Sequence, residues 1–270
     1  MKLSRLLPLL LALAVVSCTA EKEEFFEDDE NIHVSGGYKL KKRTFWDDYD
    51  TNMDSYTTFA YDKNGRVKEI VYVHESKDIY KDVISWGDNM VYYEWMRYEE
   101  DQMYTFEKDK VIRKETKDYT MRFEYDPSNR LYKYYLSTKS HDSEVTYYWD
   151  NGKLSKVTRH DDAGTHQHDY TYRISYEGDE CNGYFPWFFP SDDYIFCPLI
   201  QANPELVGIK QTYIPSKVEL KGYSSYSGLL YDRSYYIECQ KDKNGCVDFM
   251  LIKEKETHDY GNTYTFEWGK

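Results

Sequence analysis

A short hairpin motif recurs along this chain and restricts the fold more than any other feature of the sequence. "TFAYDKNGRVKEIVYV" begins at residue 58, and related stretches follow as "RFEYDPSNRLYKYYL" at 122, "TYYWDNGKLSKVTRH" at 146 and "IECQKDKNGCVDFML" at 237. Each places Gly, Asn or Pro between two runs rich in Val, Leu, Tyr and Phe. Gly and Asn tolerate the positive φ that tight turns need. No stretch shows a sustained helical period with caps.

The repeated hairpins predict an all-β fold. We count roughly sixteen strands from Tyr38 to Trp268, each pairing with its neighbour in sequence. So many strands in one sheet curl or close on themselves. We therefore expect a single domain over 38–270, an extended antiparallel β-meander that is curled or partly closed like a barrel. Its outward faces are rich in Lys and Glu rather than apolar, so we do not expect the strands to cross a membrane.

One irregular insert, 178–213, interrupts the hairpins. It holds the chain's dense aromatic and proline cluster, whose candidate ligand-binding residues are Tyr184, Phe185, Trp187, Phe188 and Phe189. One interpretation is a plug whose apolar side chains cap the open end of the sheet. The other is a ligand-facing loop, because an exposed apolar patch of this size marks a binding site.

The first residues have the pattern of a lipoprotein signal peptide. A basic start is followed by a short apolar stretch over 6–16, too short to span a membrane, and "VVSC" then ends at Cys18. The pattern predicts removal of residues 1–17 and lipidation of Cys18. A plain secretory signal and a cytosolic protein with an apolar start are the alternatives.

Residues 18–37 form an acidic stretch that ends in two glycines, and we expect a flexible tether there. An acidic run just after the lipidated Cys resembles the surface-export signal of Bacteroidota lipoproteins. This predicts an outer-membrane, lipid-anchored protein displayed on the cell surface, with a periplasm-facing lipoprotein as the alternative. The formal net charge of -13 disfavours nucleic acid and anionic headgroups as partners.

Four cysteines remain once Cys18 is lipidated, an even number for an oxidising compartment. Sequence order suggests the disulfides Cys181–Cys197, across the insert, and Cys239–Cys246, across one hairpin. The other pairings and free thiols stay open.

The hairpins of the form Y-D-x-x-G-R, the irregular insert and the segment Ile214-Pro215-Ser216-Lys217-Val218 together resemble a family of Bacteroidota lipoproteins. That family is a domain of unknown function with Tyr-Asp/Gly hairpin repeats and a porin-like or YD-repeat-like β fold. The resemblance covers most of 38–270. It implies the fold and the envelope location and transfers no catalytic residue.

Motifs of catalysis are missing from the sequence. There is no G-x-S-x-G, no H-E-x-x-H, no P-loop and no dinucleotide fingerprint. We therefore expect no enzyme activity and no cofactor, although a hydrolase with a carboxylate pair in an unidentified cleft stays an alternative.

Three histidines in "RHDDAGTHQHDY" offer one metal-binding hypothesis. If Asp162-Ala163-Gly164 forms a three-residue loop, His160 faces His166 and His168 lies on the same face. Three imidazoles together bind zinc, copper or nickel. A loop one residue longer moves His160 off that face, and the plain alternative is an exposed polar hairpin.

Tyrosine is abundant, with 30 residues. One tyrosine-rich face could stack on sugar rings. Adjacent pairs such as Tyr92-Tyr93 put rings on both faces, which favours cross-strand pairs that hold the sheet together. The function we expect is that of a non-catalytic envelope lipoprotein that binds a glycan or a surface protein. A structural spacer or assembly partner in an outer-membrane complex is the alternative.

Overall fold

The computed structural model describes residues 37–47, 55–74, 78–96, 99–164, 166–186, 197–225, 228, 230–255 and 261–270. These residues form sixteen strands and two short helices. The elements are β1 (Lys39–Asp47), β2 (Ser55–Tyr61), β3 (Val67–His74), β4 (Asp78–Trp86), β5 (Met90–Trp95), β6 (Glu100–Glu107), β7 (Lys110–Glu115), β8 (Tyr119–Tyr125), β9 (Leu131–Thr138), β10 (Asp142–Asp150), β11 (Lys153–Asp162), β12 (Gln167–Glu180), α1 (Pro198–Ala202), η1 (Pro204–Val207), β13 (Tyr213–Ser224), β14 (Leu230–Lys241), β15 (Val247–Glu254) and β16 (Gly261–Gly269).

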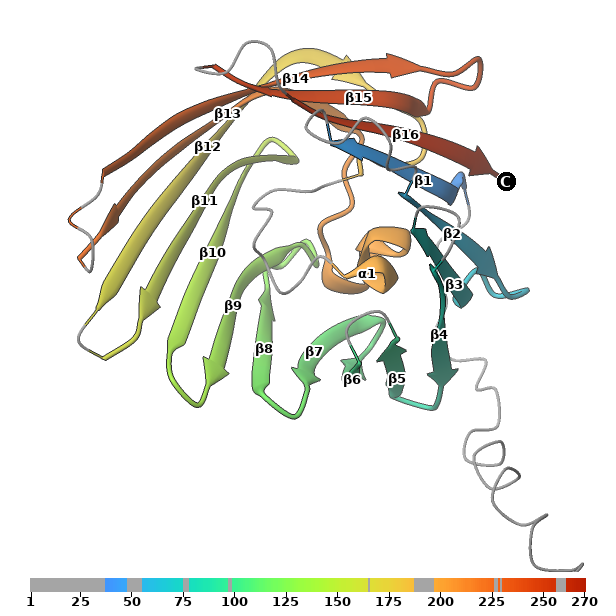
Figure 1. Cartoon of the computed structure of the whole chain (residues 1–270), viewed down its shortest axis with the longest axis horizontal. Helices are drawn as coiled ribbons and strands as arrows, with labels where there is room; N and C mark the ends of the chain where they lie inside the picture. Colours follow the sequence, from blue (N-terminus) through green and yellow to red (C-terminus); the bar gives the residue numbers. More distant parts are fainter. Residues whose placement is uncertain are drawn as a thin grey trace, which may run out of the picture.

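Every strand pairs antiparallel with its neighbours in sequence, and β1 also pairs with β16, so the meander closes into a barrel (Figure 1). The closing register runs from Lys39 opposite Gly269 to Asp47 opposite Asn262. The predicted fold class is confirmed, and the open question of closure is answered by this last pairing.

The barrel has two unlike ends, because successive strands alternate in direction. We call one the insert end: it carries Lys39, Gly269, the tight turns such as β2–β3, β8–β9 and β14–β15, and the β12–β13 insert. The other, the far end, carries the connections β1–β2, β3–β4, β9–β10, β11–β12 and β13–β14. The start of β1 and the end of β16 therefore lie together at the insert end.

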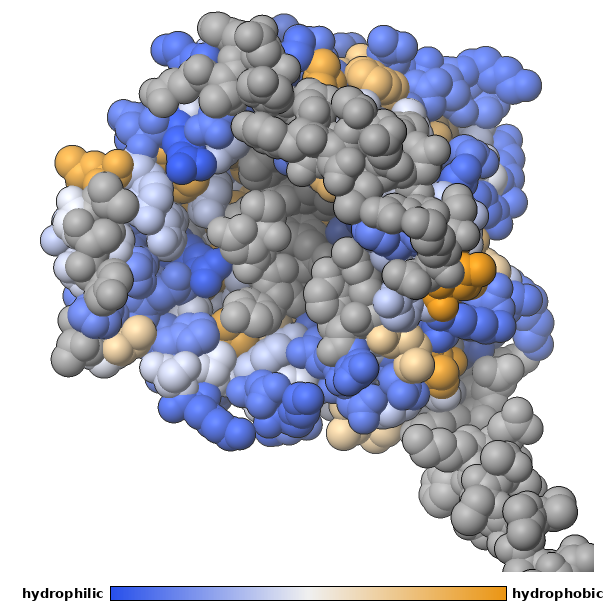
Figure 2. Space-filling view, viewed as in Figure 1, coloured by the Kyte–Doolittle hydropathy of each residue, from blue (hydrophilic) through white to orange (hydrophobic). Residues whose placement is uncertain are grey.

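The apolar side chains point into the barrel. Along β8 the buried residues Tyr119, Met121 and Phe123 lie on one face, and the exposed Arg122 and Glu124 lie on the other. This alternation is what a sheet with one packed face produces. The outer face carries ion pairs such as Lys81–Glu69 at 2.6 Å and Lys253–Glu238 at 3.0 Å. In Figure 2 the described residues of the visible face are mostly hydrophilic, with hydrophobic residues in scattered spots.

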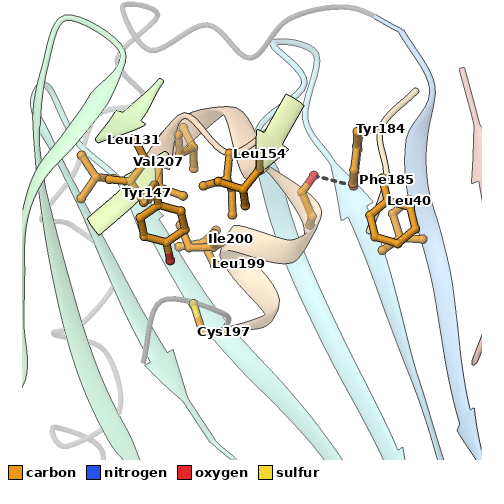
Figure 3. Close-up of a cluster of buried hydrophobic side chains, with 14 of the residues drawn as sticks. Leu40, Leu131, Tyr147, Leu154, Tyr184, Phe185, Cys197, Leu199, Ile200 and Val207 are labelled. Atoms are coloured by element: carbon orange, nitrogen blue, oxygen red, sulfur yellow. Dashed lines mark hydrogen bonds between the residues drawn. The ribbon is translucent and has the colours of Figure 1, made fainter. Parts of the chain in front are cut away.

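The insert fills part of the barrel interior. Leu199, Ile200, Leu206 and Val207 of α1 and η1 are at most 1% exposed. Figure 3 shows Leu199, Ile200 and Val207 among inward side chains of the strands, which include Leu131, Tyr147 and Leu154. Gly208, at φ 66°, lies against the backbone of Asn129 and Leu131, where a Cβ would come within 2.8 Å. The insert is thus a plug that completes the core. No helix among the described residues has the length and apolar content to span a membrane.

The recurring turns share one hydrogen-bond pattern. In the β2–β3 turn, Asp62 Oδ1 accepts from the amides of Asn64 and Arg66, and its Oδ2 accepts from Arg66 Nε at 2.6 Å. The Arg66 guanidinium lies 5.4 Å from the Trp86 ring centroid, and Trp86 Nε1 donates to Val67 O. The sequence motif therefore encodes an Asp acceptor, an Arg partner and a Trp on the next hairpin.

Candidate functional site

A row of polar side chains crosses four strands inside the barrel at the far end. The register places Ser143 of β10 opposite Asp161 of β11, Asp161 opposite His168 of β12, and His168 opposite Ser224 of β13. We call these four residues the polar row. Each lies within one residue of the far end of its strand. They share the inward face with the buried Val145 and Val157 one or two positions deeper.

Two members of the polar row have buried atoms without a partner. Asp161 Oδ1 accepts from Arg159 Nε at 2.8 Å, so this carboxylate is engaged. Ser143 is 4% exposed, and its Oγ makes no hydrogen bond; the same is true of the buried His168 Nδ1. Buried polar groups in folded proteins are almost always hydrogen-bonded, and exceptions need an explanation. A polar ligand or water held in the barrel would supply the missing partners.

An aromatic layer lies one step deeper on the same wall. Arg159, Tyr170, Gly222 and Tyr231 face one another across β11 to β14. The ring centroids of Tyr170 and Tyr231 are 5.7 Å apart, and the planes of the His168 and Tyr170 rings are parallel within 1°, with their centroids 6.3 Å apart. A Cβ on Gly222 would come within 2.5 Å of the Tyr170 ring, so glycine makes room for this ring. The long strands β11 to β14 of this wall lie away from α1 in Figure 1.

Charged groups complete the wall next to these rings. Arg233 of β14 faces inward opposite Leu220, and its Nε lies 3.5 Å from Glu254 Oε1 on β15. Guanidinium, carboxylate, imidazole and hydroxyl groups thus surround half-buried tyrosine rings. Flat apolar area flanked by directed hydrogen-bonding groups is the usual composition of a site for a polyhydroxylated ligand.

The predicted aromatic loop is found partly in the core. Tyr184 and Phe185 are 3% and 2% exposed, and Tyr184 Oη donates to the carbonyls of Gln201 and Ala202 at 3.1 Å (Figure 3). These two residues serve the plug, and as buried groups they cannot form the ligand-facing surface of the alternative interpretation. Trp187, Phe188 and Phe189 lie outside the described residues.

The three predicted metal ligands are not brought together. The register pairs His160 with Asp169 and Asp161 with His168, so the assumed three-residue loop is wrong. His160 therefore points outward, where its Nδ1 lies 2.7 Å from Asp169 Oδ1, while His168 points inward. The Asp169 hydrogen bond raises the pKa of His160. No cluster of three metal-binding side chains occurs within the parts of the chain that the structure describes.

The structure joins none of the four described cysteines in a disulfide, so neither predicted disulfide is present in it. Cys197 Sγ lies 3.1 Å from Tyr104 Oη on β6, across the barrel from the β14–β15 turn that carries Cys246. Cys239 lies opposite Met250, four residues beyond Cys246 along β15, an offset of roughly 13 Å at the usual rise per residue. A disulfide needs Cα atoms within about 7 Å, so this hairpin pairing is wrong. Cys18 lies outside the described residues.

A second concavity lies on the outer face. A groove of about 480 Å³ is lined by Ile112, Arg113, Arg122, Phe123, Glu124 and Tyr135, where β7 and β8 share only three register pairs. Arg113 and Arg122 are opposite each other, but Arg113 is bonded to Glu115 at 2.7 Å and Arg122 lies over the Tyr135 ring. Both arginines are therefore engaged by neighbouring side chains, Arg113 by a carboxylate and Arg122 by an aromatic ring.

The polar row does not follow from the sequence alone, because it depends on the register of the strands. The inward period-two pattern of Ser143, Val145 and Tyr147 is visible in the sequence, and so is that of His168, Tyr170 and Tyr172. Only the pairing of strands shows that the polar members meet. A search for polar residues at the apolar phase of a strand would have found them.

Comparison with solved structures supports the fold. A crystal structure of a porin-like protein from Bacteroides uniformis superposes with a TM-score of 0.59 at 12% identity, covering 88% of this chain and 100% of that chain. A porin-like protein from Bacteroides vulgatus gives a TM-score of 0.61 at 10% identity, covering 85% of this chain and 98% of that chain. No protein-family model matches the chain, and no curated protein matches it.

Proposed function

We propose that this protein is a non-catalytic, lipid-anchored envelope protein whose barrel interior binds a glycan at the far end. The observation that carries the binding proposal is the polar row, where Ser143 Oγ and His168 Nδ1 are buried without partners above an aromatic layer. A sugar hydroxyl donates and accepts hydrogen bonds, and its ring carbons stack on tyrosine. One ligand class therefore satisfies both layers.

The envelope location is supported by two independent features. The chain begins with a lipoprotein-like signal that ends at Cys18, and its fold is similar to porin-like proteins of Bacteroides. The outer face of the barrel carries exposed ion pairs around its circumference, for example on β3–β4, β9–β10 and β14–β15. Charged residues facing lipid are costly, so the proposal places the barrel beside the membrane rather than within it.

The anchor and the site would lie at opposite ends of the molecule. The tether over residues 18–37 joins the barrel near Lys39 at the insert end, whereas the polar row lies at the far end. A lipid on Cys18 would hold the plugged end toward the membrane. The binding wall would then open toward the solvent, where a glycan is accessible.

The absence of turnover is proposed from the chemistry of the polar row. A serine hydrolase needs a carboxylate that orients histidine and a histidine that accepts the serine proton. Asp161 instead accepts a hydrogen bond from Arg159 Nε, and His168 Nδ1 makes no hydrogen bond. The arrangement recognises hydroxyl groups without an activated nucleophile.

The test is a glycan array probed with the soluble chain that begins at Thr19, followed by calorimetry on any hit. Ser143→Ala and His168→Ala should each weaken binding at least several-fold. Ser155→Ala is the matched control, because Ser155 lies on the outer face of β11 and donates to Tyr148 O. Unchanged affinity in both inner variants would remove the polar row as the site. Product analysis of the bound glycan tests for turnover.

A structural role is the second candidate, favoured by apolar side chains on the outer face. Ile79 and Val83 of β4 are 68% and 45% exposed and share that face, because they are four residues apart on one strand. In-cell photo-crosslinking from position 79 would detect a protein partner. A blank array together with a specific crosslink would replace the glycan proposal by this one.

A further inference from the structure

The β14–β15 turn repeats the Asp-centred turn but replaces its arginine with cysteine. Asp242 Oδ1 accepts from the amides of Asn244 and Cys246 at 2.8 and 2.9 Å, as Asp126 Oδ1 accepts from those of Ser128 and Arg130. Cys246 therefore stands where the two other turns have Arg66 and Arg130. It is 0% exposed, so the thiol occupies the buried position of the arginine side chain.

The start of the insert takes the space that an arginine would fill. In the other turns the guanidinium lies 5.4 Å from the ring of Trp86 or Trp149. Trp268 is the matching ring of the third turn, since its Nε1 donates to Val247 O. Its ring is met by Tyr184, at 4.9 Å and edge-on, and it would lie 3.5 Å from a Cβ on Gly183. Because this turn has no arginine, the space beside the Trp268 ring is free for the start of the insert.

The same segment brings a second thiol to Cys246. The amide of Asn182 donates to Gly245 O at 2.8 Å, and the Asn182 side chain donates to Asn244 O at 2.5 Å. With standard peptide geometry, the first bond limits the Cα separation of Cys181 and Cys246 to about 8 Å. A disulfide spans Cα separations of about 4.4–6.8 Å, a range that lies within this limit. Its formation takes Cys181 Sγ away from the carbonyl of Thr212, to which it donates at 3.3 Å.

The electrostatics place Cys181 near both candidate partners, Cys246 and Cys239. Burial raises the pKa of Cys181 to about 12, with the neighbouring Cys246 as the second cause. Cys181 in turn contributes to the raised pKa of Cys239. Cys239 is the competing partner, but within the described part of the chain no backbone hydrogen bond ties its segment to that of Cys181 as the bond from Asn182 to Gly245 does for Cys246.

We infer that Cys181 and Cys246 form a disulfide that staples the start of the insert to the β14–β15 turn. Two S–H bonds and the S–S bond of a disulfide oxidant break, one S–S bond forms between the cysteines, and the two protons and two electrons reduce the oxidant to two thiols. The oxidant is a thiol–disulfide oxidoreductase of the envelope or oxidised glutathione. The inference rests on the envelope location of the proposed function, because the cytosol keeps thiols reduced.

The bond should form while the chain folds. Both thiols are at least 95% buried, and burial raises the pKa of Cys246 to about 11. The thiolate is the reacting species in disulfide exchange, and both thiols hold their protons at neutral pH once the barrel has closed. Oxidation of the folded, reduced protein should therefore be slow.

The test has two arms. In the first, the full chain with its own leader is expressed in the envelope of a Gram-negative bacterium, alkylated during lysis, and mapped by mass spectrometry without reduction. In the second, the full chain with Cys18→Ala is refolded from denaturant with reduced and oxidised glutathione and mapped in the same way. A linked peptide pair containing Cys181 and Cys246 is expected in both arms.

The outcomes separate the pairing from the location. Cys181 linked to Cys239, or four alkylated thiols after refolding, overturns the inference. The expected link after refolding with free thiols in cells supports the pairing and removes the envelope location. Cys246→Ser should lower the thermal midpoint by several degrees under oxidising conditions. Cys239→Ser is the matched control: it should keep the link and most of that midpoint, and loss of the link in this variant also overturns the inference.

Discussion

The Asp-centred turns of the insert end and the polar row of the far end differ in how their acceptors are satisfied. The carboxylates of Asp62 and Asp126 accept hydrogen bonds from backbone amides and from an arginine. In the polar row, Ser143 Oγ and His168 Nδ1 are buried without partners. The turn carboxylates thus stabilise the fold, whereas the polar row keeps hydrogen-bonding capacity that folding does not use.

This difference separates two uses of polar residues in one barrel. A satisfied buried ion pair tolerates no loss of one partner, because the remaining charge stays buried. A buried hydroxyl without a hydrogen-bond partner lowers the stability of the ligand-free protein. Substitutions at the two ends should therefore have opposite signs.

The largest effect is expected at the insert end from Asp62→Ala. This change removes the carboxylate from the buried Arg66, which is 1% exposed, and should cost about 3–5 kcal/mol of unfolding free energy. Asp242→Ala removes the same backbone acceptors without a buried arginine and should cost about 1–3 kcal/mol. Urea unfolding measures both, and equal losses would show that arginine burial does not distinguish the turns.

A pH-dependent effect of intermediate size is expected from Asp82, which ties β4 to the far end. Its carboxylate accepts from Tyr93 Oη at 2.6 Å and from the amide of Met96 at 3.1 Å. Burial nevertheless raises the pKa of Asp82 from 3.8 to about 6. A raised folded-state pKa contributes stability that is present below the unfolded value and lost as pH rises through 6.

Asp82→Asn should remove that dependence. Relative to the variant, the native chain should lose roughly 2 kcal/mol between pH 4 and pH 7. Urea unfolding of both proteins at each pH gives the difference, in which other groups cancel. Parallel curves across this range would mean that Asp82 stays ionised at no cost.

The smallest effect is expected from Ser143→Ala at the far end. Because the hydroxyl is buried and unpartnered, its removal should leave the unfolding free energy unchanged or raise it by about 1 kcal/mol. The measurement is thermal or urea unfolding beside Ser155→Ala, whose hydroxyl is bonded. A loss of more than about 1 kcal/mol in Ser143→Ala would show that Ser143 is a satisfied structural group and would end the contrast between the ends.

Local turn chemistry made the fold predictable from sequence. Motifs such as Asp62 to Arg66 and Asp126 to Arg130 act within five residues, so their hairpins, and the number of strands, follow from short stretches. Closure did not follow, because it depends on β1 meeting β16 across the whole chain. The insert was recognised as a break, but only packing shows that Tyr184 and Phe185 belong to the core.

The candidate site was less predictable for the same reason. One residue of loop length decided whether His160 or Asp161 lies on the same face of the sheet as His168. The sequence of the β11–β12 loop allows both lengths. The wrong cysteine pairings came from pairing neighbours in sequence. The contact between Cys181 and the β14–β15 turn depends instead on where the insert crosses the barrel.

The pairing of β1 with β16 also sets the order of events during biogenesis. The first strand exposes an unpaired edge from the moment it emerges, and its partner is the last strand to leave the ribosome or the translocon. Unpaired edges are templates for aggregation. Long-range strand pairing is also slow, because the entropy of closing the loop is lost before the new contacts stabilise the chain. A chaperone that shields the β1 edge until β16 is available would therefore determine how much of this protein closes into its native barrel.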